Sequence, residues 1–356
     1  MKKTILLIIT MFLLLVGCST NTNVVCKTTV HEDTQFDSVF ADVSIEEFMS
    51  NGFEFGDSVN VSFSNGLELK DIPYYSGYYT RKGEPLICGY PGYEFIAITK
   101  SSSGLWTDSG LKEGDGVEIT LNQKAKYIDV QESLSQKYSL ELSDYKSEEA
   151  FANFRAMTTS KLKDNYLFRG ASPCDDTNKR VETVNKLLEK SGINYVITLS
   201  NSEEEFINYG LDENLYINKL YKDNKIVFLD MTADYGSDAY RKAVVEGFEK
   251  ILTNDGPFYI HCLEGKDRTG FVCLLLEALV DSDIEEMKAD YMQTYDNYYG
   301  VNKTSDPKKY DAIENLYFEG FVEFLGEPLK DSAFNYLKDS GMSENDINSL
   351  IQKISK

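Results

Sequence analysis

The spacing of hydrophobic residues differs between the two halves of the chain. Between about Phe53 and Val130, apolar residues alternate with polar ones, as they do at Val59, Val61 and Phe63. A period of two predicts β-strands that bury one face. No long segment with helical spacing interrupts this part. The pattern therefore predicts a small all-β domain, an antiparallel sheet or barrel, over residues 51–135.

After a polar linker, the pattern becomes that of an α/β protein. Short apolar runs at Asn194–Leu199, Ile226–Met231 and Pro257–His261 predict buried strands. Helical spacing separates them, and the very apolar segment Thr269–Val280 predicts a helix after the third strand. This alternation predicts a mainly parallel sheet flanked by helices, with a helical C-terminal extension, over residues 145–356. Ligands of such folds bind beyond the carboxyl ends of the strands.

The N-terminus has the pattern of a signal peptide. Two lysines precede the apolar run Ile5–Val16, and its twelve residues are too few to span a membrane as a helix. We expect residues 1–17 to be removed. The segment Leu15-Val16-Gly17-Cys18 resembles the bacterial lipobox, which implies a lipid on Cys18. By this resemblance, residues 18–50 would be a tether to the extracytoplasmic face of a bacterial membrane.

Charge and cysteine content narrow the function further. The formal net charge of −22 argues against nucleic acid as a partner, because binding there requires cations that neutralise phosphates. An acidic surface also repels anionic substrates, so a phosphate site would need local positive charge. The remaining cysteines have no spacing typical of a metal site or a disulfide framework. Pairing of Cys26 with Cys88 or Cys174 stays open.

One loop between the third strand and the apolar helix can bind phosphate. It reads His261-Cys262-Leu263-Glu264-Gly265-Lys266-Asp267-Arg268-Thr269-Gly270. The backbone N–H groups of residues 263–268 can point inward, and the following helix adds its positive N-terminal end. That field favours the thiolate of Cys262, which could attack phosphorus. The planar guanidinium of Arg268 would hold two phosphoryl oxygens.

This loop resembles the signature of the protein tyrosine phosphatase superfamily, His-Cys-x5-Arg-Ser/Thr. Its Gly-Lys-Asp-Arg-Thr-Gly segment is similar to a bacterial branch with tyrosine, dual-specificity and phosphoinositide phosphatases. The resemblance implies a phosphocysteine intermediate and hydrolysis without a metal ion or other cofactor. It also implies that Thr269 assists departure of the thiolate and that His261 supports the loop. It covers about Tyr166 to Tyr299, and the β-rich part lies outside it.

Three aspartates are candidates for the general acid that protonates the leaving oxygen. Asp230 and Asp234 lie about 30 residues before the cysteine, where many relatives carry this acid, but Asp230 falls inside a predicted strand. In the branch with the Gly-Lys-Asp-Arg segment, the aspartate within the loop has this role, so we favour Asp267. Lys266 is expected to add positive potential at the mouth of the pocket.

The loop does not select one substrate class. Phosphotyrosine is the leading expectation, with phosphoserine, phosphothreonine or phosphoinositides beside it. An inositol polyphosphate would need several further Lys or Arg partners. A non-catalytic surface protein that holds a phosphorylated ligand is the alternative from another class. Clustered tyrosines at residues 74–93 and 291–299 are interpreted as core.

Overall fold

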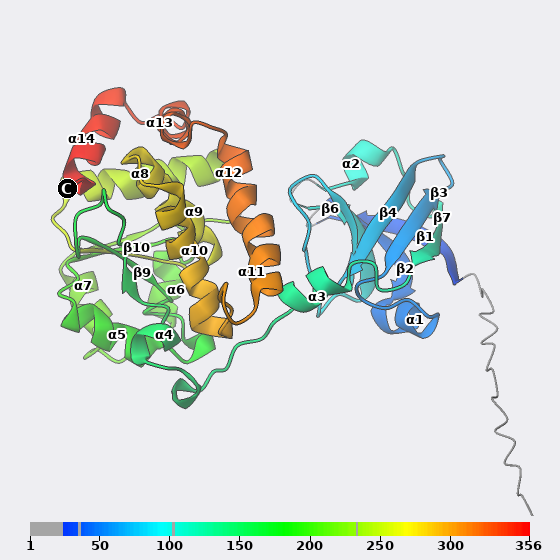
Figure 1. The fold of residues 1–356 in the computed structure, drawn as a ribbon, viewed down its shortest axis with the longest axis horizontal. Coiled ribbons are helices and arrows are strands. Elements are labelled where there is room, and N and C mark those ends of the chain that lie inside the picture. Colours follow the sequence, from blue (N-terminus) through cyan, green and yellow to red (C-terminus); the bar gives the residue numbers. More distant parts are fainter. Residues whose placement is uncertain (1–23, 35–36, 102–103, 233) are drawn as a thin grey trace, which may run out of the picture.

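The computed structural model describes residues 24–34, 37–101, 104–232 and 234–356 (Figure 1). The predicted signal peptide and Cys18 lie outside the described residues. Among the helices of the described part, none is long and apolar enough to cross a membrane.

Seven strands near the N-terminus close into a barrel, drawn in blue and cyan in Figure 1. Their order is β1-β2-β6-β5-β4-β3-β7, and β7 pairs with β1. The alternating residues Val59, Val61 and Phe63 point into its core. The bounds are Val25–Asp33 (β1), Ser38–Ser44 (β2), Ser58–Phe63 (β3), Glu68–Tyr75 (β4), Pro85–Cys88 (β5), Phe95–Lys100 (β6) and Gly116–Gln123 (β7), with the short helices α1 (Ile45–Ser50), α2 (Trp106–Ser109) and α3 (Ile128–Leu134).

The expectation of a tether over residues 18–50 is wrong from Val25 onward. This segment supplies β1, β2 and α1, and β1 is the strand that closes the barrel against β7. Val30, Val39 and Phe48 are completely buried. Their burial makes this segment part of the barrel core.

A second sheet lies in the C-terminal half, with the order β11-β10-β12-β9-β8. Its strands are β8 (Arg155–Ala156), β9 (Leu167–Gly170), β10 (Tyr195–Thr198), β11 (Ile226–Phe228) and β12 (Phe258–His261). The pairings of β10 with β11, β10 with β12 and β12 with β9 are parallel, and β8 runs antiparallel to β9. The predicted mixed α/β architecture with an N-terminal all-β unit is therefore confirmed.

Helices cover both faces of this sheet (Figure 1). Val196 and Tyr259 face the core on the side of α5 and α7, whereas their neighbours Ile197 and Ile260 face the larger core around α8 and α9, as the period of two requires. The helices are α4 (Glu148–Phe151), α5 (Val181–Lys190), α6 (Glu203–Asn208), α7 (Tyr216–Lys222), α8 (Asp238–Thr253), α9 (Asp267–Leu279), α10 (Ile284–Tyr299), α11 (Pro307–Ile313), the π-helical turn η3 (Glu314–Phe318), α12 (Glu319–Leu325), α13 (Leu329–Asp339) and α14 (Glu344–Ile354), with 3-10 turns η1 (Leu142–Asp144) and η2 (Asp176–Asn178).

The structure places the cysteines and the clustered tyrosines. The five cysteines of the described part are free and buried. Tyr74 and Tyr75 lie in the barrel core as expected, but Tyr90 is 46% exposed. The stripe on α10 is core, since Tyr291, Tyr295 and Tyr298 are buried.

Candidate active site

The phosphate-binding loop predicted from the sequence connects the end of β12 to the start of α9. Cys262 directly follows the strand and is 3% exposed, and α9 begins five residues later at Asp267. Gly265 has a φ of +67°, and a Cβ there would lie 2.2 Å from the carbonyl oxygen of Gly170 in β9. This position therefore requires glycine for its conformation and for its close approach to β9.

Every carbonyl group from Cys262 to Lys266 accepts a hydrogen bond. Four of the partners come from other segments of the catalytic half, and the other two, His261 and Gly270, are the first and last residues of the loop sequence. The carbonyl oxygens bind His261 Nδ1 at 3.2 Å (Cys262), Ser172 N at 3.1 Å (Leu263), Tyr298 Oη at 2.7 Å and Asn153 Nδ2 at 3.2 Å (Glu264), Asn153 Nδ2 at 3.2 Å and Arg169 Nη2 at 3.1 Å (Gly265), and Gly270 N at 2.7 Å (Lys266).

This pattern fixes the direction of the loop's N–H groups. A trans peptide is planar, so the C=O of one residue points opposite to the N–H of the next. Because the carbonyls of residues 262–266 turn toward these partners, the N–H groups of residues 263–267 turn away from them. Within the described part of the chain, the N–H groups of residues 263–266 donate to no other group. They form a row of donors suited to an anion.

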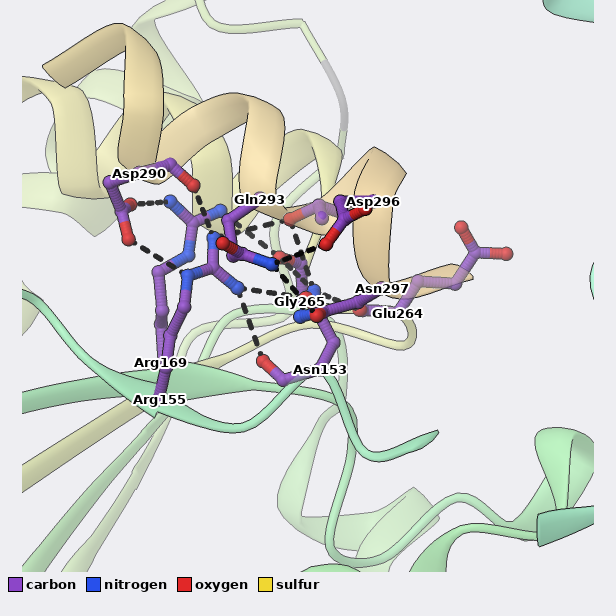
Figure 2. A network of polar contacts seen from close by, with 10 residues as sticks. Asn153, Arg155, Arg169, Glu264, Gly265, Asp290, Gln293, Asp296 and Asn297 are labelled. Atoms are coloured by element: carbon purple, nitrogen blue, oxygen red, sulfur yellow. Dashed lines mark hydrogen bonds and ion pairs between the residues drawn. The ribbon is translucent and has the colours of Figure 1, made fainter. Parts of the chain in front are cut away.

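A buried polar network holds two of these carbonyls (Figure 2). Asp290 of α10 binds Arg155 Nε at 2.8 Å and Arg169 Nη1 at 2.5 Å, and Arg169 in turn donates to Gly265 O. Asn153 Oδ1 accepts from Arg155 Nη1 at 2.8 Å, which orients its amide nitrogen toward the loop. The loop is thereby connected through side chains to β8, β9 and α10.

The same network carries positive charge behind the loop. Burial raises the pKa of Asp290, but the two arginines outweigh it and hold that pKa below its usual range. Burial opposes the charge of Arg169, yet Asp290 raises the pKa of that guanidinium overall. Two cations thus share one carboxylate. Burial holds the pKa of the neighbouring Glu277 well above its usual range, which favours the neutral form of its carboxyl group.

His261 is neutral and fixes the start of the loop. It is fully buried, and burial lowers its pKa to about 3. A neutral imidazole carries one N–H, and the carbonyl of Cys262 can only accept, so the proton lies on Nδ1. Nε2 then accepts from the Thr198 hydroxyl at 3.0 Å. The histidine joins β10 to the first peptide of the loop.

Arg268 and Thr269 each retain unused hydrogen-bonding capacity. Arg268 Nη1 donates to Met231 O at 2.9 Å, and no carboxylate of the described residues pairs with the guanidinium. The Thr269 hydroxyl is buried and has no hydrogen-bond partner in the described part of the chain. Unsatisfied buried groups are uncommon in folded proteins, and each requires an explanation.

Glu264, one of the two acidic residues of the loop, is paired with neighbouring side chains. Glu264 accepts from the Tyr138 hydroxyl at 2.6 Å and pairs with Lys266 Nζ at 3.0 Å. Burial raises the pKa of Glu264, but Lys266 and Tyr138 lower it overall. Lys266 also lies 3.9 Å from Asp267 Oδ2. Its charge therefore compensates two carboxylates of the loop.

The three candidate acids lie in different surroundings. Asp267 is the first residue of α9, and its side chain is 56% exposed. Asp234 lies in the segment that follows Met231; it accepts from Gly236 N at 3.1 Å and pairs with Lys82 Nζ of the barrel at 3.5 Å. Asp230 follows the end of β11 with a φ of +41° and lines a cavity whose described lining includes no residue of the loop. The predicted strand to Met231 ends at Phe228, so Asp230 is not within it.

Sequence reasoning missed the residues that orient the loop. Asn153, Arg155, Asp290 and Tyr298 lie outside the loop, and Tyr298 was interpreted as core. Long-range contacts of this kind leave no local pattern. One signal was available in the sequence. Arg155 and Arg169 lie on short buried segments, and two such arginines indicate that a buried carboxylate pairs with them.

A model of the tyrosine phosphatase family matches residues 149–355. The match covers more than half of the 356 residues, so the chain belongs to the tyrosine phosphatase family and is a cysteine-based phosphatase. No curated protein matches the chain.

Solved structures give weaker similarities. An uncharacterized conserved protein from Thermotoga maritima is 22% identical, with a TM-score of 0.24, over 26% of this chain and 35% of its own. The core catalytic domain of the PP-IP phosphatase SIW14 from S. cerevisiae, in complex with citrate, is 17% identical, with a TM-score of 0.29, over 52% and 94%. P. aeruginosa TpbA is 18% identical, with a TM-score of 0.25, over 55% and 88%. The chain thus spans about a third of the length of the first structure.

Proposed function

We propose that the protein hydrolyses phosphomonoesters through a phosphocysteine on Cys262, without a metal ion, and that phosphotyrosine is its principal substrate. Phosphoserine, phosphothreonine and phosphoinositides are further candidates for the same site. The observation that carries the proposal is the run of five outward carbonyls between Cys262 and Arg268. It turns a row of N–H donors toward the space where a phosphoryl group would bind.

The proposed reaction has two steps. The Cys262 thiolate attacks phosphorus, so that an S–P bond forms and the P–O bond to the leaving group breaks while an acid supplies a proton to the leaving oxygen. Water then attacks phosphorus, its proton returns to that acid, and cleavage of the S–P bond releases inorganic phosphate and the thiolate. The N–H groups of residues 263–267 and the guanidinium of Arg268 bind the phosphoryl oxygens in both steps.

Asp267 is the proposed acid. Its position at the start of α9 supports this role, as does its exposed carboxylate, whose one ionic partner among the described residues is Lys266 at 3.9 Å. Asp234 is the second candidate because Met231, three residues earlier, binds Arg268. The unpartnered Thr269 hydroxyl supports a role in stabilising the departing thiolate.

The activity is tested with para-nitrophenyl phosphate, phosphopeptides and inositol hexakisphosphate. Wild-type protein should release phosphate in the presence of a chelator, and Cys262→Ser should release none. The acid is identified by comparing para-nitrophenyl phosphate with phenyl phosphate, because a poorer leaving group depends more on a proton donor. Asp267→Asn should lose a larger factor in kcat on phenyl phosphate than on para-nitrophenyl phosphate. Asp234→Asn and Asp230→Asn should lower kcat by the same factor on both substrates or leave it unchanged. Binding of phosphopeptide by Cys262→Ser without any turnover by wild type would favour the non-catalytic alternative.

We also propose that the mature protein begins at Cys18 and is attached by a lipid to the outer face of a bacterial membrane. The charged start, the short apolar run and the motif ending in Cys18 support this location. Expression of the full chain in a bacterium, followed by detergent phase partitioning, tests it. Wild type should partition into the detergent phase, and Cys18→Ala should remain in the aqueous phase. Equal partitioning of both would contradict the proposal.

A further inference from the structure

The barrel reaches the catalytic half of the chain through the segment between β4 and β5. Arg81 in this segment pairs with Glu323 of α12 at 2.6 Å and donates to Asn315 Oδ1 at 2.7 Å. Lys82 pairs with Asp234, beside the Arg268-binding segment. Figure 1 shows α11 and α12 on the side of the catalytic half that faces the barrel. The charged contacts fix this segment at the edge of the proposed active site.

A cavity of about 400 Å³ lies between the two halves at this point. Its aromatic lining comes from both: Tyr78 belongs to the barrel, and Tyr235, Tyr317, Phe321 and Phe324 belong to the catalytic half. Asp267 also lines it, and Asp267 is adjacent to Arg268 in the loop. The cavity therefore borders the phosphate-binding loop at Asp267. Its volume is at the small end of the range for ligand pockets.

The charge of the cavity selects between the candidate substrates. Its cations, Arg81 and Lys82, already pair with Glu323 and Asp234. A multiply charged inositol phosphate needs unpaired cations beyond the phosphate loop, and this lining does not supply them. Tyr235 and Phe324 pack edge to face, with ring centroids 4.6 Å apart and an interplanar angle of 76°. Such walls suit another aromatic ring.

We propose that this cavity is a specificity subsite, partly built by the barrel, for an aromatic side chain that flanks the phosphorylated residue of a peptide. The inference rests on the proposed phosphatase activity and narrows its substrate class from phosphomonoesters to phosphopeptides. It also gives the barrel a function, because Tyr78 and the Arg81 and Lys82 contacts complete the wall of the subsite.

Gly320 provides a matched pair of variants. It lies within α12 and lines the cavity, and a Cβ built there has no atom within 4 Å. Gly320→Ala adds one methyl group and leaves most of the volume open, whereas Gly320→Trp would fill it. Circular dichroism and thermal unfolding of both variants should show that they are folded. Phe324→Ala, which removes a wall instead of filling the cavity, is the second variant.

The experiment measures kcat/KM on a series of phosphotyrosine peptides, in which phenylalanine or glycine is placed in turn at each position near the phosphotyrosine. Each value is divided by kcat/KM on para-nitrophenyl phosphate. Wild type and Gly320→Ala should prefer phenylalanine at one position by about tenfold, the effect of burying one aromatic side chain. Gly320→Trp and Phe324→Ala should lose this preference. Turnover of para-nitrophenyl phosphate without any aromatic preference in wild type, or faster turnover of inositol hexakisphosphate than of every peptide, would overturn the subsite. Absence of all turnover would instead overturn the proposed activity.

Discussion

Gly265→Ala tests whether the shape of the loop is what makes the site competent. Two costs follow from the structure. A non-glycine residue at a φ of +67° costs about 1–2 kcal/mol. In addition, the new Cβ would lie 2.2 Å from Gly170 O, whereas ordinary contacts begin at 3.4 Å, so the loop must move by about 1.2 Å away from β9. A displacement of about 1 Å in a catalytic site can cost about 100-fold in rate.

Gly192→Ala separates these two costs. Gly192 has a φ of +62°, and its Cβ would meet nothing within 4 Å, so this variant has the strain without the displacement. Both variants should lose about 1–2 kcal/mol of unfolding free energy in urea. Gly265→Ala should in addition lose about 100-fold in kcat/KM on para-nitrophenyl phosphate, and Gly192→Ala should keep wild-type activity. If Gly265→Ala retained more than about half of the wild-type kcat/KM, the loop geometry would not be the source of activity.

Three further predictions concern the groups that hold the loop. Asp290→Asn leaves two buried arginines without a carboxylate and should lower the unfolding free energy in urea by about 3 kcal/mol; a loss below about 1 kcal/mol would contradict the network. Tyr298→Phe removes one of the two donors to Glu264 O and should cost about 1 kcal/mol and several-fold in kcat/KM, whereas Tyr74→Phe, which removes a buried hydroxyl with no hydrogen-bond partner among the described residues, should cost neither. His261 has a folded pKa of about 3 against 6.5 unfolded, so the unfolded state binds its proton first and stability falls as the pH drops from 6.5. Between pH 6.5 and 5 the wild type should therefore lose about 2 kcal/mol of unfolding free energy, and His261→Gln should not show this loss. If the unfolding free energies of the two proteins changed in parallel with pH, the buried neutral histidine would be contradicted.

The sequence predicted the elements whose signal is local. The apolar runs that became β10 and β12 and the helix that became α9 were found within a few residues, because burial on both faces leaves a continuous apolar segment. The loop was predictable because its chemically active residues are adjacent in the sequence.

Features that depend on long-range contacts were not predictable in this way. The prediction of a tether is wrong for β1 and β2 because the burial of these strands depends on pairing with β7 and β6, far along the chain. The outward carbonyls need partners from Asn153, β9 and α10, which no local pattern connects to residue 265. The contact of Arg81 with Glu323 joins residues 242 positions apart. Such contacts require the folded arrangement.

The most direct test of the account is a crystal structure of Cys262→Ser with tungstate, an oxyanion that resembles phosphate and does not react. We predict that the oxyanion lies within hydrogen-bonding distance, about 3 Å, of the N–H groups of residues 263–267 and of the Arg268 guanidinium. The carbonyls of Glu264 and Gly265 should keep Tyr298, Asn153 and Arg169 as partners. An oxyanion bound elsewhere, or loop amides that point away from it, would contradict the account.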